Sequence, residues 1–271
     1  MKTQQLISVA RRLVAGDKGL LAMDESNPTC NKRFSALGIL QTVDVRRAYR
    51  EMIVTTPGLG ECISGVILYD ETIRQQTSDG IPFVKAITDA GIIPGIKVDT
   101  GAKEMAGHPG EKITEGLDGL RVRLVEYSKM GARFAKWRAV FAVGDGIPSR
   151  GCMEANAHAL ARYAALCQEA GLVPVVEPEV LMDGVHTLDQ TCGVTEEVLR
   201  TVFSQLYAQR SILHDRTVQL ERHHNTDQHG GRLFHAGTNV DHQAGWQPDR
   251  TGTDLHLDTP AIHCGHGDTR R

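Results

Sequence analysis

Five short apolar runs that each end in charged residues constrain the fold of this 271-residue chain more than any other feature. Three runs end in ionisable residues two positions apart, and two end in an adjacent acidic pair. These residues are Lys97 and Asp99, Lys136 and Arg138, Glu177 and Glu179, Asp24 and Glu25, and Asp70 and Glu71. Residues i and i+2 of a β-strand share one face, and burying charge is costly unless a ligand or partner compensates it. Several such strands in succession indicate the carboxyl-end active site of a parallel α/β barrel.

Strand-like and helix-like segments alternate along the first 210 residues. Near-continuous apolar runs, as expected of strands covered on both faces, begin at residue 19 and recur in GVILYD, IIPGIKVD, RFAKWRAV and LVPVVEPEV. Helices are expected over 3–15, 42–56, 118–132, 153–172 and 194–210, with Thr42 and Asp118 as caps. The order predicts a right-handed parallel α/β fold. A barrel is favoured over a doubly wound sheet, because the chain has no glycine-rich dinucleotide fingerprint and its charges follow several strands.

Composition narrows the function further. An apolar share of 41% and a charged share of 23% are ordinary for a globular protein. The net charge of −3 gives no basic field for nucleic acid, so local Lys and Arg must hold any anionic substrate. No run approaches about 18 uninterrupted apolar residues, and the first residues lack a signal-peptide core, so we expect a cytoplasmic chain without a membrane span. The six cysteines show no CxxC spacing and are expected to be free thiols.

The chain changes character after Arg210. Nine of the twelve histidines follow it, whereas the last lysine is Lys136. Residues 211–271 show little apolar periodicity, so we expect a partial barrel over 1–210, an irregular or disordered tail over 211–271, and no sixth strand. Our hypothesis is a broken reading frame near Ser211, and a natural disordered tail is the alternative. A zinc site is a further alternative, although the spacing fits no tight structural site. Its candidate ligands are His223, His224, His229 and His235, or His263, Cys264 and His266.

The motifs together resemble one family. LLAMDES followed by KRF, GVILYDETIRQ, GIKVDTG, GLDGL, FAKWR, MEANAHALARYA and VPVVEPEVLMDGVH are similar to class I fructose-bisphosphate aldolase, the Schiff-base enzyme of glycolysis. The resemblance runs in unbroken order from about residue 10 to Arg210. It implies a (β/α)8 TIM barrel, of which the first five βα units are present, and a homotetramer. It also implies metal-free and cofactor-free cleavage of fructose 1,6-bisphosphate, a phosphorylated sugar, to dihydroxyacetone phosphate and glyceraldehyde 3-phosphate.

The resemblance also implies roles for individual residues. Carbon–carbon cleavage needs an amine that forms an iminium as electron sink, carboxylates that move protons, and cations that hold phosphates. Asp24 is expected beside the scissile bond, Lys136 near the reacting hydroxyls, and Glu177 as acid/base. Glu179 is expected to orient this network. Substrate and phosphate contacts are expected from Thr29, Arg33, Lys97 and Arg138.

One departure from the family pattern affects activity. The Schiff-base lysine of the family follows on a sixth strand, and this sequence has no lysine after Lys136. We therefore predict that the chain as written is inactive. Three functions stay open: an aldolase, a non-catalytic aldolase-like subunit, and another phosphosugar barrel enzyme. Two structural alternatives also stay open, namely that Asp24 caps the next helix, and that Glu177 and Glu179 only form ion pairs with Lys136 and Arg138.

Overall fold

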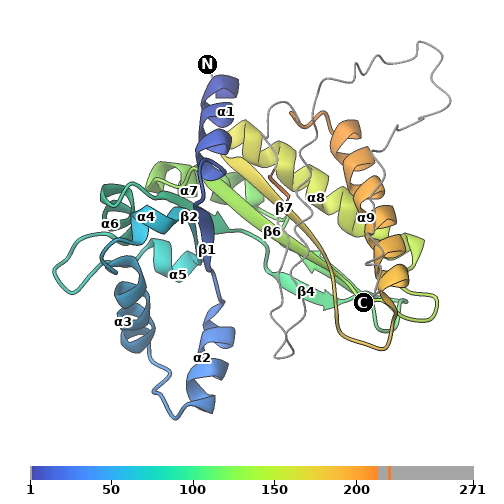
Figure 1. Ribbon diagram of the computed structural model, residues 1–271, viewed down its shortest axis with the longest axis horizontal. Coiled ribbons are helices and arrows are strands. Elements are labelled where there is room, and N and C mark those ends of the chain that lie inside the picture. Colours follow the sequence, from blue (N-terminus) through green and yellow to red (C-terminus); the bar gives the residue numbers. More distant parts are fainter. Residues whose placement is uncertain (1, 213–218, 221–271) are drawn as a thin grey trace, which may run out of the picture. The chain divides into compact units, whose positions relative to one another are not determined.

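The computed structural model describes residues 2–212 and 219–220 of the chain. These residues contain a curled, all-parallel sheet of order β1-β2-β3-β6-β7-β8 that makes up part of a barrel (Figure 1). Its strands are β1 (Gly19–Met23), β2 (Ile63–Leu68), β3 (Ile93–Lys97), β6 (Phe134–Phe141), β7 (Val173–Val180) and β8 (Gln219–Leu220). The α/β class and the five predicted strands are confirmed.

Helices connect the strands in the predicted order, and the five predicted helices are present. The helices are α1 (Lys2–Leu13), α2 (Asn27–Ala36), α3 (Val43–Val54), α4 (Leu59–Cys62), α5 (Asp70–Ile73), α6 (Phe83–Asp89), α7 (Leu120–Met130), α8 (Arg150–Ala170) and α9 (Leu188–Ala208). Thr42 caps α3 as predicted, because its side chain accepts a hydrogen bond from the Val45 amide. The cap predicted at Asp118 is wrong. Gly119, with φ of 67°, takes the N-cap position of α7 and leaves Asp118 outside it.

The lower part of the barrel interior is a small apolar floor. Leu6, Ala10 and Leu13 of α1 pack there against residues of four strands. The strand residues are Ile67, Ile93, Phe134, Val173 and Val175. Glycines on β2 and β3 leave room for the Phe134 ring. A Cβ at Gly65 would lie 2.6 Å from Leu13 Cδ2, and one at Gly95 would overlap the ring itself.

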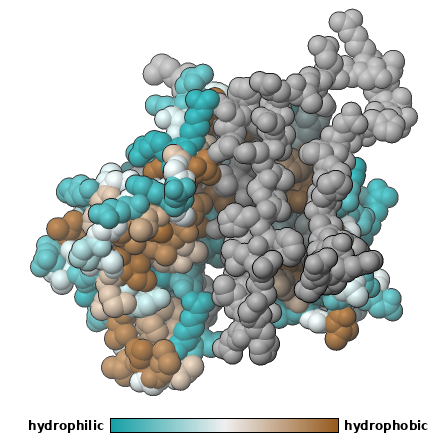
Figure 2. Space-filling model, in the orientation of Figure 1, coloured by the Kyte–Doolittle hydropathy of each residue, from teal (hydrophilic) through white to brown (hydrophobic). Residues whose placement is uncertain are grey.

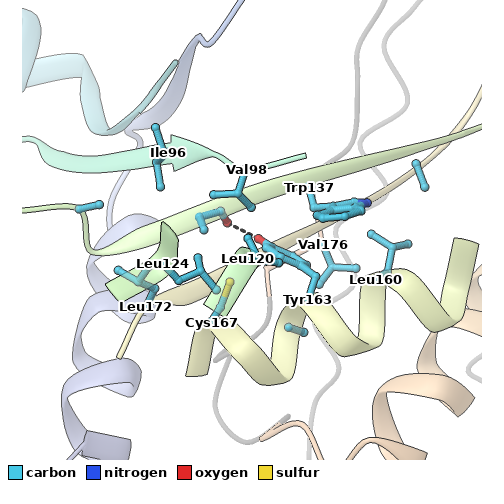
Figure 3. Packing of buried hydrophobic residues seen from close by; sticks show 14 of the residues in the cluster. Ile96, Val98, Leu120, Leu124, Trp137, Leu160, Tyr163, Cys167, Leu172 and Val176 are labelled. Carbon is cyan, nitrogen blue, oxygen red and sulfur yellow. Dashed lines mark hydrogen bonds between the residues drawn. The ribbon is translucent and has the colours of Figure 1, made fainter. Parts of the chain in front are cut away.

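The outer face of the sheet packs against α7 and α8 in the larger apolar core. Figure 3 shows Trp137 of β6 and Tyr163 of α8 between the sheet and the helix. The Tyr163 hydroxyl lies 2.5 Å from the Ala135 carbonyl and 3.1 Å from the Val175 carbonyl, so it joins α8 to both β6 and β7. The residues between these carbonyls and the strand ends carry the charged side chains of the interior.

An antiparallel hairpin that the sequence analysis did not predict lies between β3 and α7. It consists of β4 (Gly101–Glu104) and β5 (Lys112–Glu115). Asn156 of α8, which is fully buried, accepts a hydrogen bond from the Thr114 amide and donates to the Lys112 carbonyl. Glu111 accepts from the Ser149 amide at 2.6 Å. These contacts fasten the hairpin to the start of α8.

The chain after α9 differs from the expectation that no strand follows. Gln219 and Leu220 pair in parallel with Val175 and Val176 of β7. Before them, the Ile212 amide donates to Gln168 of α8 at 2.8 Å, so the contact with the barrel extends past Arg210. Parallel pairing needs only backbone hydrogen bonds, which the apolar periodicity of a sequence does not reveal. The rest of the predicted tail lies outside the described residues.

Exposed apolar side chains gather around the turn between α2 and α3. Leu37 is 74% exposed, Leu40 71% and Val43 50%. Figure 2 shows apolar residues at this end of the described region, at the lower left. Among the described helices, none is long and apolar enough to cross a membrane.

Candidate active site

Lys136 occupies the centre of the charged layer above the floor. Its Nζ lies 3.0 Å from Glu177 Oε2 and 3.7 Å from Asp24 Oδ2. Lys136 is 4% exposed and Glu177 is fully buried. The three residues come from β6, from β7 and from the residue directly after β1. The structure thus brings together three of the four catalytic candidates on three different segments.

The Asp24 carboxyl is well placed to hold a proton. Burial raises its pKa above the ordinary value, and the positive charge of Lys136 offsets this only in part. Such a carboxyl exchanges protons more readily near neutral pH than an exposed aspartate does. Asp24 does not cap α2, because Ser26 takes that position and accepts from the Thr29 amide. The helix-cap alternative for Asp24 is therefore wrong.

Arg138 and Glu179 form the next pair along the same strands. The Arg138 guanidinium donates from Nε to the Glu179 carboxylate. Burial alone would lower the pKa of Arg138, but the hydrogen bond and charge of Glu179 raise it. The fourth catalytic candidate, Glu179, is thereby paired with Arg138, a predicted substrate-binding residue.

Lys97, at the end of β3, is held by Asp99. Its amine donates to the Asp99 carboxylate and, at 3.2 Å, to the Asp99 carbonyl. Asp99 was absent from the candidate residues, although its spacing of two from Lys97 was visible in the sequence. That spacing, which places both side chains on one face, is the signal that could have identified it.

Thr29 and Arg33, the two remaining candidates, lie on α2. The Thr29 hydroxyl lies 3.0 Å from the Ser26 hydroxyl. Arg33 is paired with Glu25, whose other carboxylate oxygen accepts from Arg50 at 2.6 Å. Both side chains therefore contact residues that follow Asp24 closely in the chain.

The observed ion pairs agree with both interpretations of the β7 glutamates. Glu177 pairs with Lys136 and Glu179 with Arg138, as the structural alternative requires. The same contacts are those of a proton-transfer network, because a buried carboxylate beside a buried amine can exchange a proton with a bound substrate. A substitution that removes the Glu177 acid separates the two interpretations.

Metal ligation has no support in the part of the chain that the structure describes, where no group of three His, Cys, Asp or Glu side chains could hold an ion. The histidine groups considered from the sequence lie outside the described residues. Five cysteines fall within the described ranges, and all of them are free thiols: Cys30, Cys62, Cys152, Cys167 and Cys192.

Comparison with known proteins identifies the family. The family described as "Glycolytic: Fructose-bisphosphate aldolase class-I" matches residues 5–223, most of the chain. This chain belongs to the class I fructose-bisphosphate aldolase family. The match includes every catalytic and substrate-binding candidate and reaches beyond Arg210.

Individual relatives agree with this family. A probable fructose-bisphosphate aldolase class 1 of Xanthomonas campestris pv. campestris is 61% identical over 213 residues, which is 79% of this chain and 64% of the relative. Fructose-bisphosphate aldolase 5, cytosolic, of Arabidopsis thaliana is 50% identical over 202 residues, 74% of this chain and 56% of that protein. The chain therefore spans about 56–64% of these curated relatives.

A solved structure supports the fold. The fructose-bisphosphate aldolase of Plasmodium falciparum, in a ternary crystal structure with TRAP and a small-molecule inhibitor, superposes with a TM-score of 0.78. It is 42% identical, and the match covers 81% of this chain and 63% of that one. The curled sheet described here corresponds to part of that aldolase fold.

Proposed function

We propose that residues 2–212 carry the sugar-phosphate binding and proton-transfer groups of a class I fructose-bisphosphate aldolase. The observation that carries this proposal is the buried Lys136 amine between the carboxylates of Asp24 and Glu177. Burying two acids around one amine costs stability, and such clusters of buried ionisable groups are concentrated at functional sites. The substrate we propose is fructose 1,6-bisphosphate.

Each group has a chemical role in this proposal. Asp24, whose pKa is raised by burial, stands beside the bond that breaks and exchanges a proton with the adjacent hydroxyl. Lys136 stabilises negative charge on the reacting oxygens. In a protein that supplies the Schiff-base lysine, Glu177 transfers protons during formation and dehydration of the carbinolamine. Glu179 orients Arg138. Lys97, Arg138, Arg33 and Thr29 hold the phosphates and hydroxyls.

The chain as written binds but does not cleave in this proposal. Cleavage requires a nucleophilic amine on a further strand, and the sequence has no lysine after Lys136. Neither Lys97 nor Lys136 substitutes for it, because each is already held by carboxylates on its own or neighbouring strands. A misplacement of about 1 Å can cost on the order of 100-fold in rate.

Calorimetric titration of the 271-residue chain with fructose 1,6-bisphosphate tests the binding. We expect saturable binding, and we expect Lys97→Met to weaken it by about tenfold, the effect of one charge-assisted hydrogen bond. Lys85→Met is the matched control, because Lys85 pairs with Asp89 on the surface and both side chains are more than half exposed. Absence of saturable binding by the folded chain would reject the proposed function.

A non-catalytic, aldolase-like subunit is the second candidate function. The exposed apolar side chains of the α2–α3 turn support assembly with another protein, since such clusters are often contact surfaces. We propose the cytoplasm as the location and the family homotetramer as the assembly. Size-exclusion chromatography with a full-length aldolase distinguishes the candidates: mixed oligomers support the subunit, and separate elution excludes it.

A further inference from the structure

We propose that Asp99 is a positioning residue, which holds the Lys97 amine and ties it to the segment of β6 that carries Lys136 and Arg138. The inference rests on the proposed function only in treating Lys97 as a phosphate contact. The holding of Lys97 itself can be tested without any ligand. The roles proposed above for the other site residues assign no role to Asp99.

The Asp99 carboxylate is buried and makes contacts in three directions. Its side chain is 3% exposed, whereas that of Lys97 is 19% exposed. One oxygen accepts from the Lys97 amine and from the Gly101 amide at 3.1 Å. The other lies 3.4 Å from the Arg138 amide. One carboxylate thus joins the end of β3, the start of the β4–β5 hairpin and the middle of β6.

The backbone around Asp99 is held tightly, so the direction of its side chain is fixed. The Val98 carbonyl accepts from Arg123 at 2.9 Å, and the Thr100 amide donates to the Glu115 carbonyl at 2.9 Å. Gly116, with φ of 131°, packs so closely that a Cβ there would lie 3.1 Å from Asp99 Cα. A carboxylate on such a backbone presents its oxygens at constant positions to Lys97, Gly101 and Arg138.

The contact with the Arg138 amide matters because of where it lies on β6. Arg138 is two residues after Lys136, and both side chains are among the candidate site residues. The Val98 amide also donates to the Lys136 carbonyl at 3.0 Å. Residues 98 and 99 therefore bind two backbone groups of the β6 segment, and the Asp99 side chain adds the Lys97 amine to the same arrangement. An amine held in this way loses little further freedom when it contacts an anion.

Lysine-specific labelling of the folded 271-residue chain tests the inference. Brief acetylation with acetic anhydride, followed by mass spectrometry, gives the rate at each lysine without ligand. We expect Asp99→Asn to raise the rate at Lys97 by about tenfold, since one charge-assisted hydrogen bond is lost. Asp89→Asn is the matched control, because it breaks the exposed Lys85–Asp89 pair and should leave the Lys85 rate within about twofold.

Two results would overturn the inference. An unchanged Lys97 rate in Asp99→Asn shows that the carboxylate does not hold the amine. An equal rise at every lysine shows that Asp99 only maintains the fold. If Asp99→Asn does not fold, Asp99→Glu keeps the charge and displaces it by one methylene. The Lys97 rate should then rise and the NMR amide signals of Gly101 and Arg138 should shift, and if neither changes the inference fails.

A ligand arm separates this inference from the proposed function. Fructose 1,6-bisphosphate should slow acetylation of Lys97 in the unsubstituted chain if Lys97 contacts a phosphate. If it gives no protection while Asp99→Asn still accelerates labelling, the proposed function fails and the role of Asp99 stands. If fructose 1,6-bisphosphate protects Lys97 while Asp99→Asn leaves the labelling rate of Lys97 unchanged, the proposed function stands and the role of Asp99 fails.

Discussion

At the scale of single residues, the Lys136–Glu177 pair has the largest energetic consequence. Glu177 is fully buried, and a buried carboxylate that loses its cation keeps the cost of desolvation without the compensating attraction. We expect Lys136→Met to lower the free energy of unfolding by about 3–5 kcal/mol. Urea denaturation measures this change. Lys85→Met should change it by less than about 1 kcal/mol, because that pair is exposed.

Glu177 separates the catalytic interpretation from the structural one. In a protein whose chain continues with a family-type sixth strand and its lysine, we expect Glu177→Gln to lower turnover by about 100-fold or more. Phosphate binding should stay nearly unchanged, because the proposed phosphate contacts Lys97 and Arg138 are held by Asp99 and Glu179, which the substitution leaves in place. Steady-state kinetics and titration with inorganic phosphate provide the two measurements. Turnover equal to that of the parent would leave Glu177 as a purely structural ion pair.

At the scale of elements, the floor of the barrel depends on glycine in two strands. Gly95→Ala would place a methyl group within the Phe134 ring, and we expect this to destabilise the protein by about 1–3 kcal/mol. Gly193→Ala in α9 is the control, since nothing lies within 4 Å of its Cβ position. That change should stabilise α9 by up to about 1 kcal/mol. Thermal denaturation compares them, and equal melting temperatures would contradict the packing argument.

The attachment of the hairpin to α8 should depend on pH. Burial alone would raise the pKa of Glu111, but hydrogen bonds from Ser149 and His108 lower it below 4.5. The ionised form therefore stabilises the fold above this value, and the stabilisation is lost as pH falls through the lower, folded-state pKa. As pH falls through the ordinary glutamate pKa and then through the lower folded-state pKa, the parent should lose more unfolding free energy than Glu111→Gln. Parallel curves for the two proteins would show that Glu111 does not contribute.

The sequence predicted these elements unevenly, for physical reasons. Strands such as Val173–Val180 were visible because both faces are covered, which gives continuous apolar runs. The meeting of Asp24, Lys136 and Glu177 followed from the rule that parallel strands end at one edge. The hairpin was not predictable, since Gly101–Glu104 is short and mostly exposed. The place of Asp99 beside the Arg138 amide depends on strand register, which spacing within one segment does not encode.

At the scale of the whole molecule, the prediction of inactivity rests on the sequence having no lysine after Lys136. We predict no measurable cleavage of fructose 1,6-bisphosphate and no reduction adduct when the 271-residue chain is treated with dihydroxyacetone phosphate and borohydride. The lack of cleavage should persist at high protein concentration, because the chain lacks the nucleophilic lysine and weak substrate binding is not the cause. An adduct mapped by mass spectrometry to Lys97 or Lys136 would overturn this prediction.

The apolar floor of the barrel also affects the order in which the chain can fold during its synthesis on the ribosome. Leu6, Ala10 and Leu13 leave the exit tunnel long before their partners Val173 and Val175, which follow some 160 residues later in the chain. Ile67 and Ile93 can cover part of the apolar face of α1 earlier, but the contacts with β7 complete the floor only after residue 175 has emerged, and such long-range closure is slow. Pulsed hydrogen exchange on nascent chains should show full protection of the α1 amides no earlier than that of the β7 amides. Until then, the apolar face of α1 is available to chaperones.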